Sequence, residues 1–128
     1  MDHPILVDTD ILVDFLRGYN KAVEFVNAHV ALIILSSIVV AELYAGVKGE
    51  QEQAALDSFI SIFQIVSPDL GIAKAAGLYK RNYGKSHGVG LADALIAATA
   101  EAENAELKTL NIKHYPMFKN MSPAYRKQ

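Results

Sequence analysis

The chain has 128 residues, of which 52% are hydrophobic, and its 12 basic and 14 acidic residues give a formal charge of −2. This length predicts a single domain over residues 1–128, and the absence of cysteine excludes disulfides and thiolate metal sites. The charge balance excludes a general basic footprint for nucleic acid, and the absence of a signal peptide or a long apolar run predicts a cytoplasmic protein with no membrane partner.

Strand-like and helix-like segments alternate along the sequence. Strands are expected over residues 5–7, 31–35, 64–66 and 107–110. Helices are expected over residues 10–17, 20–28, 38–47, 50–63, 67–83 and 91–104, followed by an irregular tail over 111–128. This alternation is typical of a parallel sheet with helices on both faces. The predicted fold is therefore α/β, an α/β/α sandwich around a parallel sheet of about four to five strands.

Capping residues and glycines set the expected ends of these helices. The expected N-caps are Thr9 or Asp10, then Asn20, then Ser36 or Ser37. Gly84 is expected to end the helix that begins near residue 67. The helix over 38–47 is apolar almost all round, which is typical of a buried helix.

Three acids lie where a parallel sheet can bring them to one edge. Asp8 follows the first strand, Glu42 lies in the helix after the second strand, and Asp93 opens the helix before the fourth. Ligands bind at this edge, outside the carboxyl ends of the strands. Each acid also has an ordinary explanation: Asp8 as a turn residue, Asp93 as a first-turn acid, and Glu42 as a side chain facing solvent or a basic partner.

The chemistry of these acids favours a particular class of cation. Oxygen ligands without cysteine or clustered histidine suit Mg²⁺ or Mn²⁺ rather than Zn²⁺. Carboxylates that hold one or two such ions support in-line displacement at phosphorus, because one ion activates a water and the other stabilises the leaving oxygen. The acids therefore predict a divalent-cation site suited to phosphodiester chemistry.

Four blocks of residues span nearly the whole chain. They are Val7-Asp8-Thr9-Asp10, Ser36 to Leu43, Leu91 to Ala100, and Thr109-Leu110-Asn111 followed by Lys113-His114-Tyr115. In this order the blocks resemble a PIN domain, and most closely the VapC-type ribonuclease toxins of toxin–antitoxin pairs. The resemblance implies a PIN-like fold and an Mg²⁺-dependent endoribonuclease, with Mn²⁺ as a substitute, that hydrolyses RNA with a metal-activated water.

The resemblance also implies roles for individual residues. Asp8 and Asp93 would be direct metal ligands, and Glu42 would be a ligand or the base that orients the water. Asn111 stands where many PIN domains carry a fourth acid, so it adds no charge for a second metal. Residues expected to fix the carboxylates, or otherwise only to cap helices, are Thr9, Asp10 and Ser37. Residues expected to hold the RNA backbone, or otherwise to form a solvated helix end, are Lys80, Arg81 and Lys85.

The expected partners follow from the same resemblance and from composition. A toxin of this type implies an antitoxin protein that inserts a segment across the acidic groove. The slightly high apolar fraction suggests a homodimer through apolar helix faces, with residues 50–63 among the candidates.

Two other functions stay open at this stage. Asp8-x-Asp10 resembles the motif of haloacid-dehalogenase-type phosphatases, with Asp8 as nucleophile and Asp10 as acid. Leu12 stands where that motif has Thr or Val, and a late pair of acids is missing. A catalytically inactive PIN-like module that binds RNA or a partner is the second alternative, although all three central acids are present. Gly84-Lys85-Ser86 lacks the earlier glycine that a P-loop requires.

Overall fold

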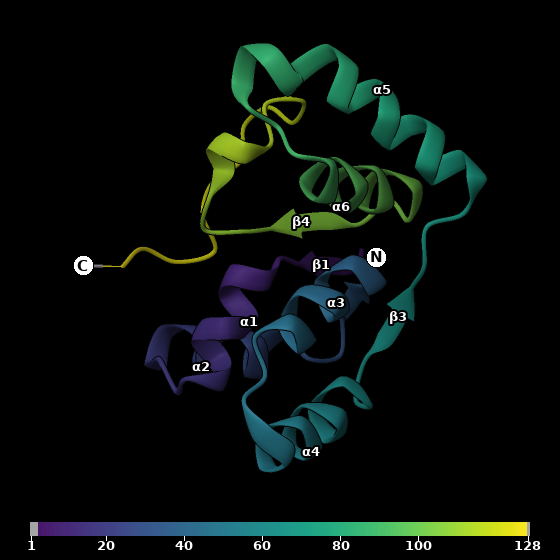
Figure 1. The fold of residues 1–128 in the computed structure, drawn as a ribbon. Helices are drawn as coiled ribbons and strands as arrows, with labels where there is room; N and C mark the ends of the chain where they lie inside the picture. Colours follow the sequence, from purple (N-terminus) through teal and green to yellow (C-terminus); the bar gives the residue numbers. More distant parts are fainter. Residues whose placement is uncertain (1–2, 128) are drawn as a thin grey trace.

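A parallel four-stranded sheet forms the centre of the computed structural model, which describes residues 3–127 (Figure 1). Its strands are β1 (Ile5–Val7), β2 (Ile33–Ser36), β3 (Gln64–Val66) and β4 (Glu106–Lys108), arranged in the order β3-β2-β1-β4. Leu6 of β1 is paired with Ile34 on one side and Leu107 on the other. Because β1 is an inner strand, the residue that follows it lies between the ends of two neighbouring strands.

Six helices and one short 3₁₀ turn surround the sheet in residues 3–127. They are α1 (Thr9–Leu16), α2 (Asn20–His29), α3 (Ser37–Ala45), α4 (Gly49–Ile60), α5 (Leu70–His87), α6 (Leu91–Ala102) and η1 (Ile112–His114). In Figure 1, α5 and α6 lie on one side of the strands, and α1, α2 and α4 lie on the other. The prediction of a parallel sheet with helices on both faces is therefore confirmed.

Burial of the central strands supplies the core. Leu6, Val7 and Leu35 have no exposed surface. Full burial of such a side chain contributes roughly 1.5–3 kcal/mol. A smaller cluster joins α5 to α6 through Ile72, Ala76, Val89, Ala94 and Ala98. The two clusters fix α6 against both the sheet and α5, and this positions the first turn of α6 at the sheet edge.

Two of the predicted N-caps are wrong. Asp8 itself caps α1, because its carboxylate accepts a hydrogen bond from the Thr9 amide at 2.8 Å, so Thr9 and Asp10 are already helical. Asn20 is likewise the first residue of α2, whose N-cap is Tyr19 and has no side-chain cap hydrogen bond. The third predicted N-cap, Ser36 or Ser37, is confirmed as Ser36, whose hydroxyl accepts a hydrogen bond from the Ile38 amide at 3.0 Å.

The prediction that Gly84 ends a helix is also wrong, because α5 continues through it to His87. The helix ends at Gly88, whose φ of 66° is left-handed. A glycine inside a helix costs only about 1 kcal/mol, so it need not stop the helix. A residue with positive φ is what ends it, and glycine adopts that conformation without a steric penalty.

The helix expected to be buried all round, α3, is buried on one side only. Val39 and Leu43 are buried, whereas Ala41, Glu42 and Ala45 are exposed. Alanine has little apolar surface to bury, so its presence on the outer side of a helix carries a small penalty. The prediction that α3 is buried on all sides is therefore wrong, because some of its apolar residues are exposed alanines.

The tail after β4 is irregular apart from η1, as predicted. Residues 1, 2 and 128 of the expected domain lie outside the described residues. Across residues 3–127, none of the helices combines the length and the apolar character needed to cross a membrane.

Substitution of a glycine inside α5 and of the glycine that ends it should change stability in opposite directions. A Cβ at Gly77, inside the helix, would meet no atom within 4 Å, so Gly77→Ala should stabilise by about 0.5–1 kcal/mol. Gly88→Ala should destabilise by roughly 1–2 kcal/mol because of its positive φ. Urea unfolding measures both changes. A penalty at Gly84→Ala with no penalty at Gly88→Ala would contradict this helix end.

Candidate active site

Asp8 lies at the carboxyl end of β1 and is only 8% exposed. Its Oδ1 accepts from the Thr9 amide at 2.8 Å, and its Oδ2 accepts from Thr109 Oγ1 at 2.9 Å and from the Tyr115 hydroxyl at 2.7 Å. A buried carboxylate is stable only when donors or a cation compensate its lost hydration. Three donors from separate parts of the chain therefore hold Asp8 in one orientation.

Asp93 comes to the same edge from the first turn of α6. The Tyr115 hydroxyl is 3.4 Å from Asp93 Oδ1, and His114 Nδ1 is 3.3 Å from Asp93 Oδ2. Burial, followed by the charge of Asp8, raises the pKa of Asp93, and His114 and Tyr115 partly offset this. The structure thus brings Asp8 and Asp93 together around one hydroxyl, which donates most strongly to Asp8.

Tyr115 is 1% exposed and is the residue between the two acids. Burial and the charges of Asp8 and Asp93 raise the pKa of Tyr115 far above its ordinary value. The phenol therefore stays protonated and remains a hydrogen-bond donor. It is the part of the site that lets two carboxylates approach each other in a partly buried place.

Glu42 reaches the edge through Thr9. The exposed Glu42 carboxylate accepts from Thr9 Oγ1 at 2.7 Å, and Thr9 directly follows Asp8. Within residues 3–127, no three His, Cys, Asp or Glu side chains lie close enough together to hold a metal ion. The Asp8–Asp93 pair is therefore the compact part of the site, and the role of Glu42 as a third ligand stays a prediction.

Asp10 fastens the segment after β4 to the first turn of α1. Its carboxylate accepts from the Ile11 amide at 2.8 Å, the Leu110 amide at 2.9 Å and Thr109 Oγ1 at 3.2 Å. Burial, and then the charge of Asp8, raises the pKa of Asp10, while these hydrogen bonds lower it. Asp10 thus positions Thr109, which donates to Asp8.

Asn111 lies beside Thr109 and is connected to Asp93 through a histidine. The backbone amide of Asn111 donates to Thr109 Oγ1 at 3.1 Å, and its side-chain Nδ2 is 3.3 Å from His114 Nε2. The other ring nitrogen of His114 faces Asp93. Asn111 is therefore placed to orient His114, and its role toward a ligand or water stays a prediction.

Ser37 and the basic cluster occupy other positions. Ser37 is the first residue of α3, next to the capping Ser36. Lys80 Nζ donates to the Val89 carbonyl at 2.9 Å, and Arg81 Nε donates to Asn82 Oδ1 at 3.2 Å. Among the described residues, none of these side chains is hydrogen-bonded to the acids of the site. Lys80 instead closes the turn that leads into α6.

The sequence interpretation missed three side chains that contact the acids, namely Thr109, His114 and Tyr115. Thr109 had a usable signal, because it follows a strand that pairs with β1 and so lies at the same edge. His114 and Tyr115 lie at the end of η1 and just beyond it, in the tail, where no periodic pattern predicts a direction for a side chain.

The donor set fits a hard divalent cation. Mg²⁺ is commonly held by one or two carboxylates and keeps several waters, and Asp8 and Asp93 supply two carboxylates. The pKa of Asp93 is raised first by burial and then by repulsion from Asp8, and a bound cation would relieve that repulsion. No cysteine competes with these oxygen ligands.

The fold has counterparts among known proteins. The model of the PIN domain family matches residues 5–115, and the chain belongs to that family. It is 42% identical over 127 residues to "Ribonuclease VapC19" of Mycobacterium tuberculosis, covering 94% of this chain and 98% of the relative. It is 36% identical over 124 residues to "Ribonuclease VapC10" of the same organism, covering 94% and 92%.

Two solved structures share the architecture. A toxin–antitoxin complex from Klebsiella pneumoniae superposes with a TM-score of 0.81 at 25% identity, covering 96% of this chain and 99% of that one. VapBC2 from Rickettsia felis, bound to a DNA fragment from its promoter, gives a TM-score of 0.74 at 31% identity, covering 91% and 94%.

Removal of the Tyr115 hydroxyl should weaken the fold through Asp8. Tyr115→Phe leaves a buried carboxylate without its shortest donor, so the free energy of unfolding should fall by about 1–3 kcal/mol. Tyr79→Phe is the matched control, because it removes a hydroxyl that donates at 2.8 Å to the exposed Glu101. Chemical denaturation in EDTA measures both; equal losses in the two variants would contradict a special role for Tyr115.

Removal of the Asp93 charge should stabilise the protein when metal is chelated. Because the folded-state pKa of Asp93 lies above its ordinary value of 3.8, ionised Asp93 destabilises the fold as pH rises through that interval. Asp93→Asn should therefore melt a few degrees higher than wild type in EDTA at pH 7, on the order of 2 °C. Mn²⁺ should raise the melting temperature of wild type but not of Asp93→Asn. A variant that melts lower than wild type at pH 7, yet is still stabilised by Mn²⁺, would contradict this.

Proposed function

We propose that this chain is the toxin of a VapBC-type toxin–antitoxin pair and an endoribonuclease that hydrolyses RNA phosphodiester bonds with Mg²⁺, which Mn²⁺ can replace. The observation that carries the proposal is 42% identity to "Ribonuclease VapC19" over 94% of this chain and 98% of that relative. Such full-length similarity supports a shared activity rather than a shared segment. The Asp8–Asp93 pair supplies a site with the matching chemistry.

The acidic residues divide the work at this site. Asp8 and Asp93 would hold the cation, and Glu42 would complete the ligand set or orient the attacking water. Mg²⁺ at this position would supply a nucleophilic water at neutral pH and neutralise charge that develops at phosphorus. Asn111 would orient a ligand or water without adding charge.

The remaining contacts keep the carboxylates in place. Thr109 and Tyr115 donate to the same oxygen of Asp8, and the Thr109 hydroxyl also contacts Asp10. Fixed donors of this kind orient ligands and reduce reorganisation during the reaction. We assign Thr9 to the same task, because it donates to Glu42 and presents its amide to Asp8.

The phosphatase alternative is disfavoured by the hydrogen bonds of Asp10, which would be the acid of its motif. Asp10 is bound to the Ile11 and Leu110 amides and is not placed as a general acid. The inactive-module alternative is disfavoured by the proximity of Asp8 and Asp93.

An apolar groove supports the proposed antitoxin partner. A cavity of about 440 Å³ lies between α1, α3 and α4. Its apolar lining includes Val13, Leu16, Leu43, Val47 and Leu56. Glu42 lies on its wall, so a segment bound there would adjoin the acidic site. The solved relatives are toxin–antitoxin complexes, which supports such a partner. Purification of the chain from its own host without a companion protein would contradict this.

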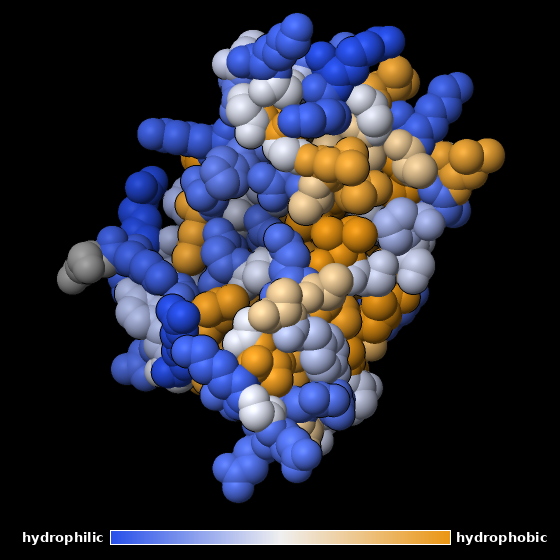
Figure 2. All heavy atoms as spheres, viewed as in Figure 1, coloured by the Kyte–Doolittle hydropathy of each residue, from blue (hydrophilic) through white to orange (hydrophobic). Residues whose placement is uncertain are grey.

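Exposed apolar side chains near β3 support a homodimer. Ile62, Ile65 and Leu70 are 62%, 37% and 86% exposed. Figure 2 shows apolar surface on the side where β3 and the beginning of α5 lie. This face adjoins the end of residues 50–63, the segment predicted as a candidate dimer interface. Light scattering that shows only monomer at high micromolar concentration would contradict the dimer. Cytoplasm is the proposed location, since it holds RNA.

A cleavage assay tests the proposed activity. Wild type should cut single-stranded RNA or transfer RNA in Mg²⁺ or Mn²⁺, and Asp8→Asn and Asp93→Asn should each lower the rate by at least about 100-fold. The exposed Glu103→Gln is the control and should cut like wild type. Gel analysis of a mixed RNA panel measures the rates, with circular dichroism to verify folding. Equal cutting by wild type and both folded variants would sink the proposal.

A further inference from the structure

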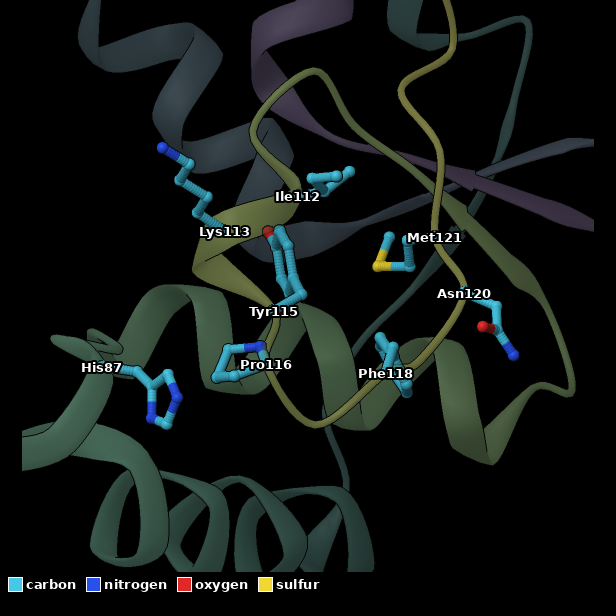
Figure 3. Close-up of a pocket in the computed structure, with 8 residues that line it drawn as sticks. All are labelled: His87, Ile112, Lys113, Tyr115, Pro116, Phe118, Asn120 and Met121. Atoms are coloured by element: carbon cyan, nitrogen blue, oxygen red, sulfur yellow. The ribbon is translucent and has the colours of Figure 1, made fainter.

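A groove of about 540 Å³ lies next to the acidic pair, on the side of η1 and the tail (Figure 3). It is lined by His87, Ile112, Lys113, Tyr115, Pro116, Phe118, Asn120 and Met121. Figure 3 shows His87 approaching Pro116 from the end of α5, while Phe118, Asn120 and Met121 follow along the tail. Neither the groove nor its polar residues take part in the site described above, except through Tyr115.

The groove is separated from the acids by a single side chain. Tyr115 lines the groove, and its hydroxyl is 2.7 Å from Asp8 Oδ2 and 3.4 Å from Asp93 Oδ1. Lys113 also lines it and precedes His114, whose ring nitrogen is 3.3 Å from Asp93. A molecule in the groove would therefore be separated from Asp8 and Asp93 by the Tyr115 side chain.

The segment that forms the groove is strongly basic. From residue 107 to residue 127 there is no Asp or Glu, and the basic residues there are Lys108, Lys113, Lys119, Arg126 and Lys127. Two of these lysines are paired with acids: Lys127 Nζ is 2.8 Å from Asp14 Oδ1, and Lys108 Nζ is 3.5 Å from Glu106 Oε2. Lys113 lines the groove. In a chain with a formal charge of −2, this is a local positive segment beside an acidic site. A polyanion would be attracted to the segment.

The groove combines this charge with apolar walls. Pro116, Phe118 and Met121 give it flat or flexible apolar surface, and His87 adds a donor. Figure 3 shows the Lys113 side chain extending from η1 away from these apolar walls, so its ammonium lies outside them. Single-stranded RNA is bound by this combination, in which bases lie on apolar or aromatic groups and cations contact the phosphates.

We propose that this groove is the subsite for the nucleotide next to the scissile phosphate. Its base lies against Pro116, Phe118 and Met121, its phosphate faces His87, and the RNA backbone continues past η1, where the Lys113 ammonium lies outside the apolar walls (Figure 3). The proposal rests on the proposed ribonuclease function and adds the path of the RNA. Contacts of Lys80, Arg81 and Lys85 with the RNA backbone stay a separate prediction.

Photocrosslinking locates the bound base directly. Single-stranded RNA that contains 4-thiouridine is irradiated with the wild-type chain in EDTA, which withholds the metal that cleavage requires. Mass spectrometry should find adducts within residues 112–121. Adducts confined to residues 80–85, or scattered without preference over the surface, would overturn the subsite.

Binding measurements test the polar groups of the groove. Lys113→Ala and His87→Ala should each weaken binding of a fluorescein-labelled 12-nucleotide RNA in EDTA by about 3–10-fold, and Lys113→Ala should reduce the salt slope by about 0.7. Lys74→Ala, on the exposed surface of α5, is the matched control and should bind like wild type. Fluorescence anisotropy across a salt series gives these values.

The outcomes separate the subsite from the proposed function. Metal-dependent cleavage by wild type, with unchanged RNA binding in Lys113→Ala and His87→Ala, would overturn the subsite and leave the ribonuclease assignment standing. Failure of wild type both to cleave RNA with Mg²⁺ and to bind it in EDTA would overturn the two together. Weaker binding in both groove variants but not in Lys74→Ala would support the subsite.

Discussion

The buried carboxylate of Asp8 is the constraint on which the rest of the site depends. A charge this far from solvent is tolerated only because donors surround it. Those donors come from the first turn of α1, from the residue after β4 and from the tail after η1. Because Thr109 and Tyr115 lie more than 100 positions after Asp8, satisfying this one group draws the end of the chain onto its beginning.

Bringing a second acid to Asp8 creates a conflict that the chain resolves only in part. Tyr115 lies between Asp8 and Asp93, yet the pKa of Asp93 is still raised by burial and by its neighbour. The pKa of Asp10 is raised by the same two causes. Carboxylates kept close together at a cost in stability are typical of sites that bind a cation, because the cation removes the repulsion. The unfavourable charge is therefore the physical basis of the proposed metal dependence.

Sequence patterns predicted the site residues that follow regular strands or begin helices, and missed the features that irregular backbone determines. An apolar run that ends in an acid was enough to place Asp8, and the helix start at Leu91 was enough to place Asp93 near the same edge. The end of α5 was misplaced because glycine occurs at both Gly84 and Gly88, and only backbone dihedrals distinguish them. The contact of Tyr115 with the acids was missed, although Tyr115 stands in one of the four blocks, because its direction is set by tertiary contacts of the tail, which has neither a period of 2 nor one of 3.6.

The same tail connects the acidic site to the proposed RNA groove. Asp14, 5% exposed in α1, accepts from the Tyr125 hydroxyl and from Lys127 Nζ, each at 2.8 Å. Between these anchors and β4, the Ala124 amide donates to the Thr109 carbonyl at 3.3 Å. Both ends of the segment that forms the groove are thus fixed to elements that carry Asp8 and its donors. A nucleotide held in that groove would therefore be positioned relative to the carboxylates by a segment that hydrogen bonds anchor at both ends. Such fixed positioning is the condition for a phosphate to reach the acids in one reproducible geometry.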